Sequence, residues 1–149
     1  MTQADERANV VAIAKSWLQT PFHHGADIKR VGVDCAQFIS AVFVEAGLET
    51  PITIKGYSEQ WYMHQSDELF LDYLTSRADE ITIEEAKPAD IVVYRFGRSF
   101  SHGGLIVNPG WPQIIHAFRQ YGVVAADDAS INGDLINRKR RFFTRKAWA

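Results

Sequence analysis

The chain has 149 residues, of which 46% are hydrophobic and 23% charged, and its formal net charge at pH 7 is −2. This length predicts a single domain over residues 1–149 with its own hydrophobic core. The nearly balanced charge excludes a general attraction to nucleic acid or to a membrane surface, and no apolar run is long enough for membrane insertion. Residues 1–7 lack the basic start and the apolar core of a signal peptide, so we expect synthesis in the cytoplasm without one.

Apolar periodicity predicts three helices in the first half of the chain, over residues 7–18, 35–46 and 66–77. The first helix should stop shortly before Pro21. Asp34 can cap the start of the second helix, and Gly47 can end it. The polar, glycine-containing segment 22–33 between these two helices is predicted to be a loop.

Short β-branched runs predict strands in the second half, over residues 91–94, 102–107, 113–118, 123–125 and 140–145. The sequence Asn108-Pro109-Gly110 is a turn signal, so the second and third of these strands should form a hairpin. Helices that precede antiparallel strands are typical of the α+β class.

Cys35 is the only cysteine in the chain and stands at the predicted start of the second helix. A cysteine attacks as the thiolate, and the positive end of a helix dipole lowers the pKa of a thiol beside it. A nearby imidazolium lowers that pKa further and can protonate a leaving amine. The alternative interpretation is that Cys35 is only a small buried hydrophobic residue.

Two histidines on the predicted hairpin are suited to assist such a thiol. If Val107 lies opposite Gln113, His102 and His116 become diagonal neighbours on the same face of the sheet. A register shifted by one residue would place them on opposite faces. The pair Gly103-Gly104 should leave room for a helix to bring the cysteine close. The hairpin therefore predicts that His102 and His116 act together as a base and an orienter for the thiol.

These blocks resemble the NlpC family of papain-like cysteine peptidases, which cut peptides of bacterial cell walls. The resemblance runs from about residue 14 to residue 118, and the blocks that carry it are Thr20-Pro21-Phe22-His23-His24-Gly25, Val33-Asp34-Cys35, Pro88-Ala89-Asp90-Ile91-Val92-Val93-Tyr94, Ser101-His102-Gly103-Gly104-Leu105-Ile106-Val107 and Ile114-Ile115-His116-Ala117. It implies a papain-like α+β fold, with N-terminal helices packed on a central antiparallel sheet and the nucleophile at a helix N-terminus. It also implies that Cys35 is the nucleophile, His102 the base and His116 the third polar residue.

The chain departs from the family pattern beside the cysteine and in the loop. Phe22 stands where the family commonly has a tyrosine whose hydroxyl points at the active site, and we expect His24 or His23 to supply the missing polar group. The candidate substrate-binding and oxyanion residues are therefore Phe22, His24 and Asp34. The backbone N–H of Cys35 is a further candidate oxyanion donor.

The resemblance implies cleavage of peptide or amide bonds in peptidoglycan stem peptides by a Cys-His-His triad. The loop 25–33 and the short chain look like phage-type members, so we expect a virion component that works beside tail or baseplate proteins at the cell wall or in the periplasm. Two alternatives are a tail assembly protein that keeps the fold structurally and a freely acting lysis enzyme. An acyltransferase of the permuted type is disfavoured, because Cys35 precedes both hairpin histidines.

Two other classes of site were weighed against this interpretation. A zinc site would draw its ligands from Cys35 and the five histidines, His23, His24, His64, His102 and His116. No CxxC motif and no helical i,i+4 ligand pair is present, so neither a metal nor another cofactor is expected. The basic run Arg138-Lys139-Arg140-Arg141 is interpreted as the solvated face of a terminal strand and not as a nucleic-acid site.

Overall fold

The structure, a computed structural model, describes residues 1–51 and 69–149. Its helices are α1 (Gln3–Ser16), α2 (Cys35–Glu45) and α4 (Leu69–Thr75), with 3-10 turns η1 (Ile83–Glu85) and η2 (Lys146–Trp148). Its strands are β1 (Asp27–Ile28), β2 (Gly32–Val33), β3 (Ala78–Ile81), β4 (Ile91–Phe96), β5 (Ser99–Ile106), β6 (Gln113–Phe118), β7 (Val123–Asp128) and β8 (Arg140–Arg145). In this part of the chain β1 pairs with β2, and the other strands form a six-stranded antiparallel sheet in the order β3-β8-β4-β5-β6-β7.

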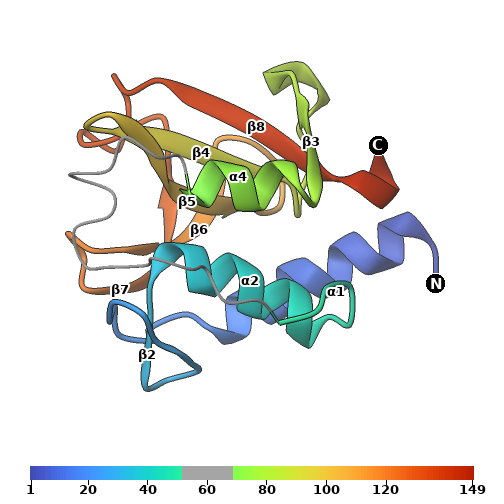
Figure 1. The fold of residues 1–149 in the computed structure, drawn as a ribbon, viewed down its shortest axis with the longest axis horizontal. Coiled ribbons are helices and arrows are strands. Elements are labelled where there is room, and N and C mark those ends of the chain that lie inside the picture. Colours follow the sequence, from blue (N-terminus) through green and yellow to red (C-terminus); the bar gives the residue numbers. More distant parts are fainter. Residues whose placement is uncertain (52–68) are drawn as a thin grey trace.

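The three helices lie together on one side of the large sheet (Figure 1). Side chains alternate along each strand, so in β4 Ile91 and Val93 join the core beneath the helices, whereas Val92 and Tyr94 point to the opposite face. Leu135, from the segment between β7 and β8, helps to cover that second face. The predicted α+β arrangement of helices on an antiparallel sheet is confirmed.

A buried arginine fastens the first helix to the sheet. Arg7 of α1 donates hydrogen bonds to Asp90 (2.9 Å) and to Thr144 of β8 (3.1 Å). Its guanidinium also lies 4.4 Å from the ring centroid of Trp148. These contacts hold the two ends of the chain on the same side of the molecule (Figure 1).

Capping residues decide where the first two helices begin and end. α1 starts earlier than predicted because Thr2 and Asp5 form a reciprocal capping box in front of the apolar face. The bounds of α2 match the prediction: the Asp34 side chain accepts a hydrogen bond from the Gln37 N–H (3.0 Å), and Gly47 follows the helix with φ +75°. The predicted start of the third helix, at residue 66, lies outside the described residues.

The sheet extends beyond the predicted strands at its two edges and at its centre, where β4 runs on to Phe96 and β5 begins at Ser99. β3 was not predicted because Ala78–Ile81 contains two adjacent acidic residues, and an edge strand that pairs only with β8 needs no continuous apolar run. β7 continues to Asp128, three residues beyond the predicted end. β6 and β8 have the predicted bounds. The predicted loop 22–33 contains the short β1–β2 pair.

The β5–β6 hairpin has the predicted register. Leu105 pairs with Ile115, and the Val107 N–H donates to the Gln113 carbonyl (2.9 Å). The two glycines of β5, however, face opposite sides of the sheet. A Cβ on Gly103 would clash with Ile39 and Phe70 beneath the helices, whereas one on Gly104 would approach His116 at 3.3 Å. The prediction that both glycines make room for the cysteine helix is therefore wrong for Gly104.

The basic terminal strand is paired with acidic side chains of its neighbours. Arg141 forms an ion pair with Glu80 of β3 (2.6 Å), and Lys146 forms one with Asp79 (2.9 Å). Arg145 lies 3.6 Å from Glu49. Of the basic residues in β8, Arg141 and Arg145 therefore have carboxylate partners.

Candidate active site

Cys35 is the first residue of α2, and Asp34 fixes the chain on both sides of it. One carboxylate oxygen of Asp34 caps the helix at the Gln37 N–H, and the other accepts a hydrogen bond from the Gly25 N–H (2.6 Å). Asp34 is buried, with 1% of its surface exposed. This carboxylate therefore ties the preceding loop to the helix start and is occupied by backbone groups.

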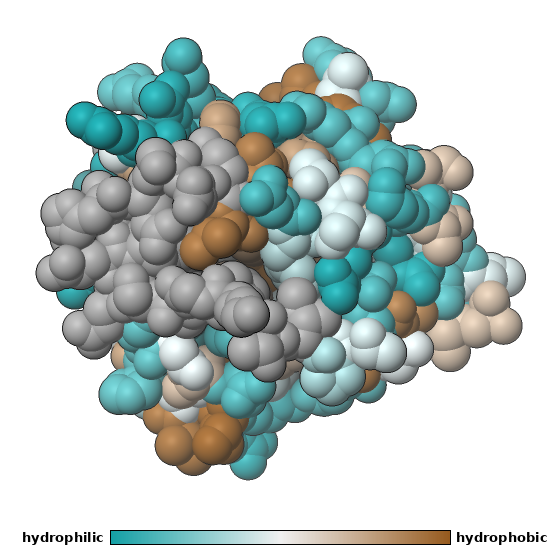
Figure 2. Space-filling view, in the orientation of Figure 1, coloured by the Kyte–Doolittle hydropathy of each residue, from teal (hydrophilic) through white to brown (hydrophobic). Residues whose placement is uncertain are grey.

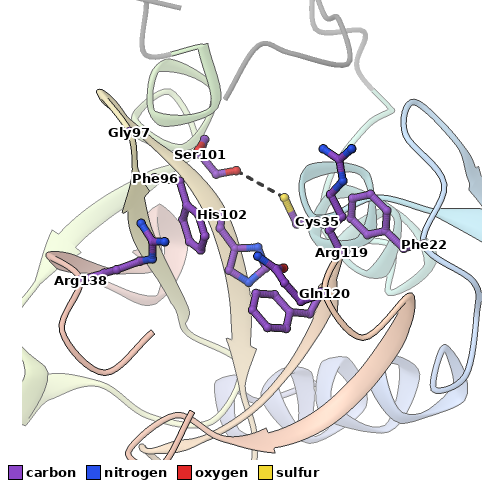
Figure 3. Close-up of a pocket in the computed structure, with 10 residues that line it drawn as sticks. Phe22, Cys35, Phe96, Gly97, Ser101, His102, Arg119, Gln120 and Arg138 are labelled. Carbon is purple, nitrogen blue, oxygen red and sulfur yellow. Dashed lines mark hydrogen bonds between the residues drawn. The ribbon is translucent and has the colours of Figure 1, made fainter. Parts of the chain in front are cut away.

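A bulge in β5 brings the strand backbone to the thiol. The register of β4 against β5 shifts between Tyr94 and Arg95, which leaves Ser101 as an extra residue beside His102. Such bulges bend a strand and redirect its side chains. The Ser101 carbonyl accepts a hydrogen bond from the Cys35 thiol at 3.4 Å, the dashed line in Figure 3. The bulge thus places the cysteine and His102 at the same cavity.

A row of hydrogen bonds leads away from His102 across three neighbouring strands. His102 Nε2 lies 2.8 Å from His116 Nδ1 on β6, and His116 Nε2 lies 3.0 Å from Asp127 Oδ2 on β7. Both histidines are buried, His116 completely. The structure therefore brings the two predicted histidines into direct contact.

Asp127 was missed by the sequence analysis, because the predicted strand stopped at residue 125. His116 pairs with Ala125 in the β6–β7 ladder, so Asp127 is its diagonal neighbour on the same face. Gly122 is the sequence signal that could have revealed Asp127. Its φ of +74° closes the turn between Phe118 and Val123, and this turn sets the register of β6 and β7. Extending β7 by two residues would then have brought Asp127 to His116.

The pKa of Cys35 differs from the prediction. Burial, with the charge of Asp34 adding to it, raises the pKa of Cys35 to about 12. Hydrogen bonding of the sulfur to the backbone, including the N–H groups of Cys35 and Ala36 at the helix start, lowers this pKa as expected, but burial outweighs it. The predicted net lowering of the thiol pKa is therefore wrong for the unliganded site.

The same burial keeps His102 uncharged. Burial, the neighbouring His116 and the Arg138 guanidinium lower the pKa of His102 well below its ordinary value, and Asp127 opposes them. At neutral pH the resting site therefore holds a neutral thiol beside a neutral imidazole. A neutral imidazole is the form that can accept a proton.

Alkylation of Cys35 should reveal this resting state. In the folded protein we expect iodoacetamide to react slowly at pH 7 and steadily faster as the pH rises to 10, because the raised pKa leaves little thiolate at neutral pH. The urea-unfolded chain is a matched control, since it contains the same single cysteine. The measurement is the rate of mass increase in both states. A pH-independent fast reaction of the folded protein between pH 5 and 8 would show a stable thiolate and contradict this account.

The site opens into a cavity of about 610 Å³. Figure 3 shows Cys35 and Phe22 on one side of it, Phe96 and Arg138 on the other, and His102 between them. The other residues that line it are Gly97, Ser101, Phe118, Arg119 and Gln120. The cavity lining thus combines three phenylalanine rings with two arginines and the two predicted reacting side chains.

Arg138 is held in place by its surroundings. Its guanidinium lies 3.6 Å from the ring centroid of Phe96 and donates to the carbonyls of Asp134 (2.7 Å) and Arg95 (3.2 Å). From its place in the basic run, this residue was expected on a solvated strand face. The structure instead places it at the cavity, where it can attract an anionic group of a substrate.

The remaining predicted site residues divide into two groups. Phe22 lines the cavity, although it brings no hydroxyl group. His23 and His24 are not among the cavity-lining residues, and His24 Nδ1 lies 4.0 Å from Asp34 Oδ2. The prediction that one of these histidines supplies the polar group of the family tyrosine gains no support from this placement.

The part of the chain that the structure describes contains neither a metal-binding group of side chains nor a helix that could span a membrane. Within residues 1–51 and 69–149, no three His, Cys, Asp or Glu side chains form a group that could hold a metal ion. No described helix is both long and apolar enough to cross a membrane. His64, one of the candidate zinc ligands, lies outside these residues.

Comparisons with known proteins agree on one family. The model of the NlpC/P60 family matches residues 19–140, a span that includes the cysteine, both hairpin histidines and Asp127. No curated protein sequence matches the chain.

Solved structures share the fold at low sequence identity. The NlpC/p60 domain of the peptidoglycan hydrolase SagA is 20% identical with a TM-score of 0.61, over 91% of this chain and 96% of that one. The peptidoglycan hydrolase RipB from Mycobacterium tuberculosis is 19% identical with a TM-score of 0.62, over 97% and 68%. NlpC2 from Trichomonas vaginalis is 15% identical with a TM-score of 0.70, over 97% of this chain but only 48% of its own.

Proposed function

Since the chain belongs to the NlpC/P60 family, we propose that it is a cysteine hydrolase that cleaves peptide bonds in peptidoglycan. The observation that carries this proposal is the arrangement of Cys35 and His102 at one cavity, with His116 hydrogen-bonded behind the base at 2.8 Å. A thiol, a general base and an orienting group in this order are the elements of covalent acyl transfer. SagA and RipB, which share the fold, are described as peptidoglycan hydrolases.

The proposed reaction begins from the neutral pair. When a peptide enters the cavity, the thiol leaves the Ser101 carbonyl, His102 accepts its proton and the sulfur attacks the scissile carbonyl carbon. The protonated His102 then gives this proton to the leaving amine as the C–N bond breaks, which leaves a thioester on Cys35. Water, deprotonated by His102, hydrolyses the thioester and restores the thiol.

The raised pKa of the thiol shapes the first of these steps. Because a stored thiolate is unfavourable in the buried site, proton transfer to His102 has to accompany the attack on the substrate. The negative charge passes to the carbonyl oxygen, and the backbone N–H of Cys35 at the helix start is our proposed donor to it. Phe22 contributes an apolar wall and no hydrogen bond to the oxyanion.

Digestion of purified peptidoglycan tests the function and identifies the bond. We expect the protein to release soluble fragments whose new amino groups can be assigned by mass spectrometry. New amino groups inside the stem peptide would identify an endopeptidase, and release of whole stem peptides from the sugar would identify an amidase. A folded protein that releases neither from walls of several chemical types would contradict the proposed function.

For delivery, we propose that the protein travels with the tail or baseplate of a phage-like particle and opens the wall locally. The β1–β2 hairpin supports a docking role, because its exposed Ile28 and Val31 form an apolar tip. Figure 2 shows hydrophobic atoms at the lower left, where Figure 1 draws this hairpin. The turn at residues 108–112 is less suitable, since Trp111 packs on Phe142 at a centroid distance of 4.9 Å.

Mass spectrometry of purified particles from the source organism tests this route. Detection of the protein in intact particles at a constant ratio to tail proteins is the expected result. Its presence only in the lysate would favour a freely acting lysis enzyme.

A further inference from the structure

We propose that Asp127, held by Tyr121 and Asn132, is a positioning residue that fixes the tautomers of both hairpin histidines and so leaves His102 Nδ1 as the basic nitrogen. This inference rests on the proposed hydrolase function for its kinetic consequences, but the tautomers themselves are a property of the resting protein.

The Asp127 carboxylate is surrounded by hydrogen-bond donors. Its Oδ2 lies 3.0 Å from His116 Nε2, accepts a hydrogen bond from the Tyr121 hydroxyl (3.1 Å) and accepts another from Asn132 Nδ2 (2.7 Å). Asn132 is itself buried, and its Oδ1 accepts a hydrogen bond from the Asp134 N–H (2.9 Å), which fixes the amide orientation. Asn132 Nδ2 also donates to the Tyr121 hydroxyl (3.1 Å), so these two side chains form one network that orients the carboxylate besides the histidine.

These donors keep the carboxylate ionised. Burial by itself raises the pKa of Asp127, but the hydrogen bonds from His116, Asn132 and Tyr121 outweigh it and lower this pKa to about 2. An ionised carboxylate has only acceptor sites. Asp127 is thus an acceptor at neutral pH.

The tautomers follow from this fixed acceptor. His116 must carry its proton on Nε2 in order to donate to Asp127, so in the neutral ring Nδ1 is an acceptor. His102 Nε2, only 2.8 Å from that Nδ1, must then be a donor. The lone pair of neutral His102 is left on Nδ1, the nitrogen that does not bond to His116.

The same row stabilises the imidazolium that forms in the reaction. The charged and titratable groups that act on His102 are His116, Arg138 and Asp127, and the Cys35 thiol lies at the same cavity. Burial, His116 and Arg138 disfavour its protonation, and Asp127 is the group that favours it. Asp127 therefore increases the basicity of His102. It acts without touching the substrate, because His116 lies between Asp127 and His102.

Replacement of Asp127 by asparagine removes the charge and the obligatory acceptor while keeping the shape. For Asp127→Asn we expect kcat to fall about 10²-fold, which is the lower end of the contribution of a positioned base. KM should change little. The acidic limb of the kcat–pH profile should move to lower pH, since the charge that raises the pKa of His102 is gone. The control is Asp128→Asn: Asp128 bonds to Ser130 and Gln113 and takes no part in the row, so its kinetics should match the wild type.

Imidazole ¹⁵N chemical shifts report the tautomer of each histidine. They would not change on substitution of Asp127 if this residue only stabilised the fold. In the wild type we expect His116 and His102 both in the Nε2–H form, and in Asp127→Asn a mixture of tautomers for His116. The proposal is overturned if wild-type His102 carries its proton on Nδ1, or if Asp127→Asn and Asp128→Asn are kinetically equal.

Two features keep the test decisive. If Asp127→Asn fails to fold, Tyr121→Phe removes one donor from a half-exposed side chain, and a smaller loss of kcat in the same direction is expected; no loss would overturn the role of Tyr121. The wild-type tautomers are measured without any substrate. An inactive wild type with the expected tautomers would therefore refute the hydrolase function and leave the tautomer assignment standing.

Discussion

Cys35→Ser is expected to remove nearly all hydrolysis of peptidoglycan fragments while leaving the fold intact. A serine hydroxyl fits the same buried position and can donate to the Ser101 carbonyl as the thiol does. It ionises far less readily than a thiol, however, and His102 is a weak base because its pKa is lowered. The measurement is fragment release by both proteins at equal concentration, with circular dichroism to compare their folds.

Cys35→Ala is the matched control for this substitution. It removes the nucleophile and the hydrogen bond together, so equal inactivity of the alanine and serine variants would show that the thiol chemistry is what matters. Activity of Cys35→Ser close to that of the wild type would contradict the role of Cys35 as nucleophile.

The second large effect is expected at the two histidines. His102→Ala should lower kcat/KM by about 10²–10⁴-fold, the usual contribution of a positioned general base. His116→Ala should be less severe, because His116 is separated from the thiol by His102 and acts by orienting it. His116→Asn and His116→Gln should be milder still, since either amide can accept the hydrogen bond from His102.

Both histidines are buried, so each variant needs a check of its stability. Thermal unfolding separates a loss of catalysis from a loss of folded protein, and rates are to be compared at a temperature at which every variant is folded. If His116→Ala had wild-type activity under these conditions, the orienting role would belong to another residue.

The hairpin that carries these histidines was predictable because its turn is explicit in the sequence. Asn108-Pro109-Gly110 fixes where the chain reverses, and the period of two along a strand then fixes which side chains share a face. Once Val107 lies opposite Gln113, that parity places His102 and His116 on the same face. The cap of α2 was predictable for a similar reason, since Asp34 acts on backbone groups within its own turn.

Features that depend on distant packing were not predictable. The pKa of Cys35 is dominated by burial, which comes from the whole core and cannot be inferred from a position at a helix start. Asp127 was missed because the polar end of β7 has no apolar period, although the sheet carries it on to His116. Arg138 lies in a basic run whose sequence gives no sign that Phe96 holds it at the cavity.

The most direct test of the central claim uses the fact that Cys35 is the only cysteine in the chain. Methyl methanethiosulfonate at pH 9 converts it to a small mixed disulfide, which intact-protein mass spectrometry can follow to completion and which a reductant reverses. The account predicts that fully blocked protein releases no fragments from purified peptidoglycan and that the reductant restores its activity. Fully blocked, folded protein that still digests the wall would show that the chemistry does not pass through Cys35.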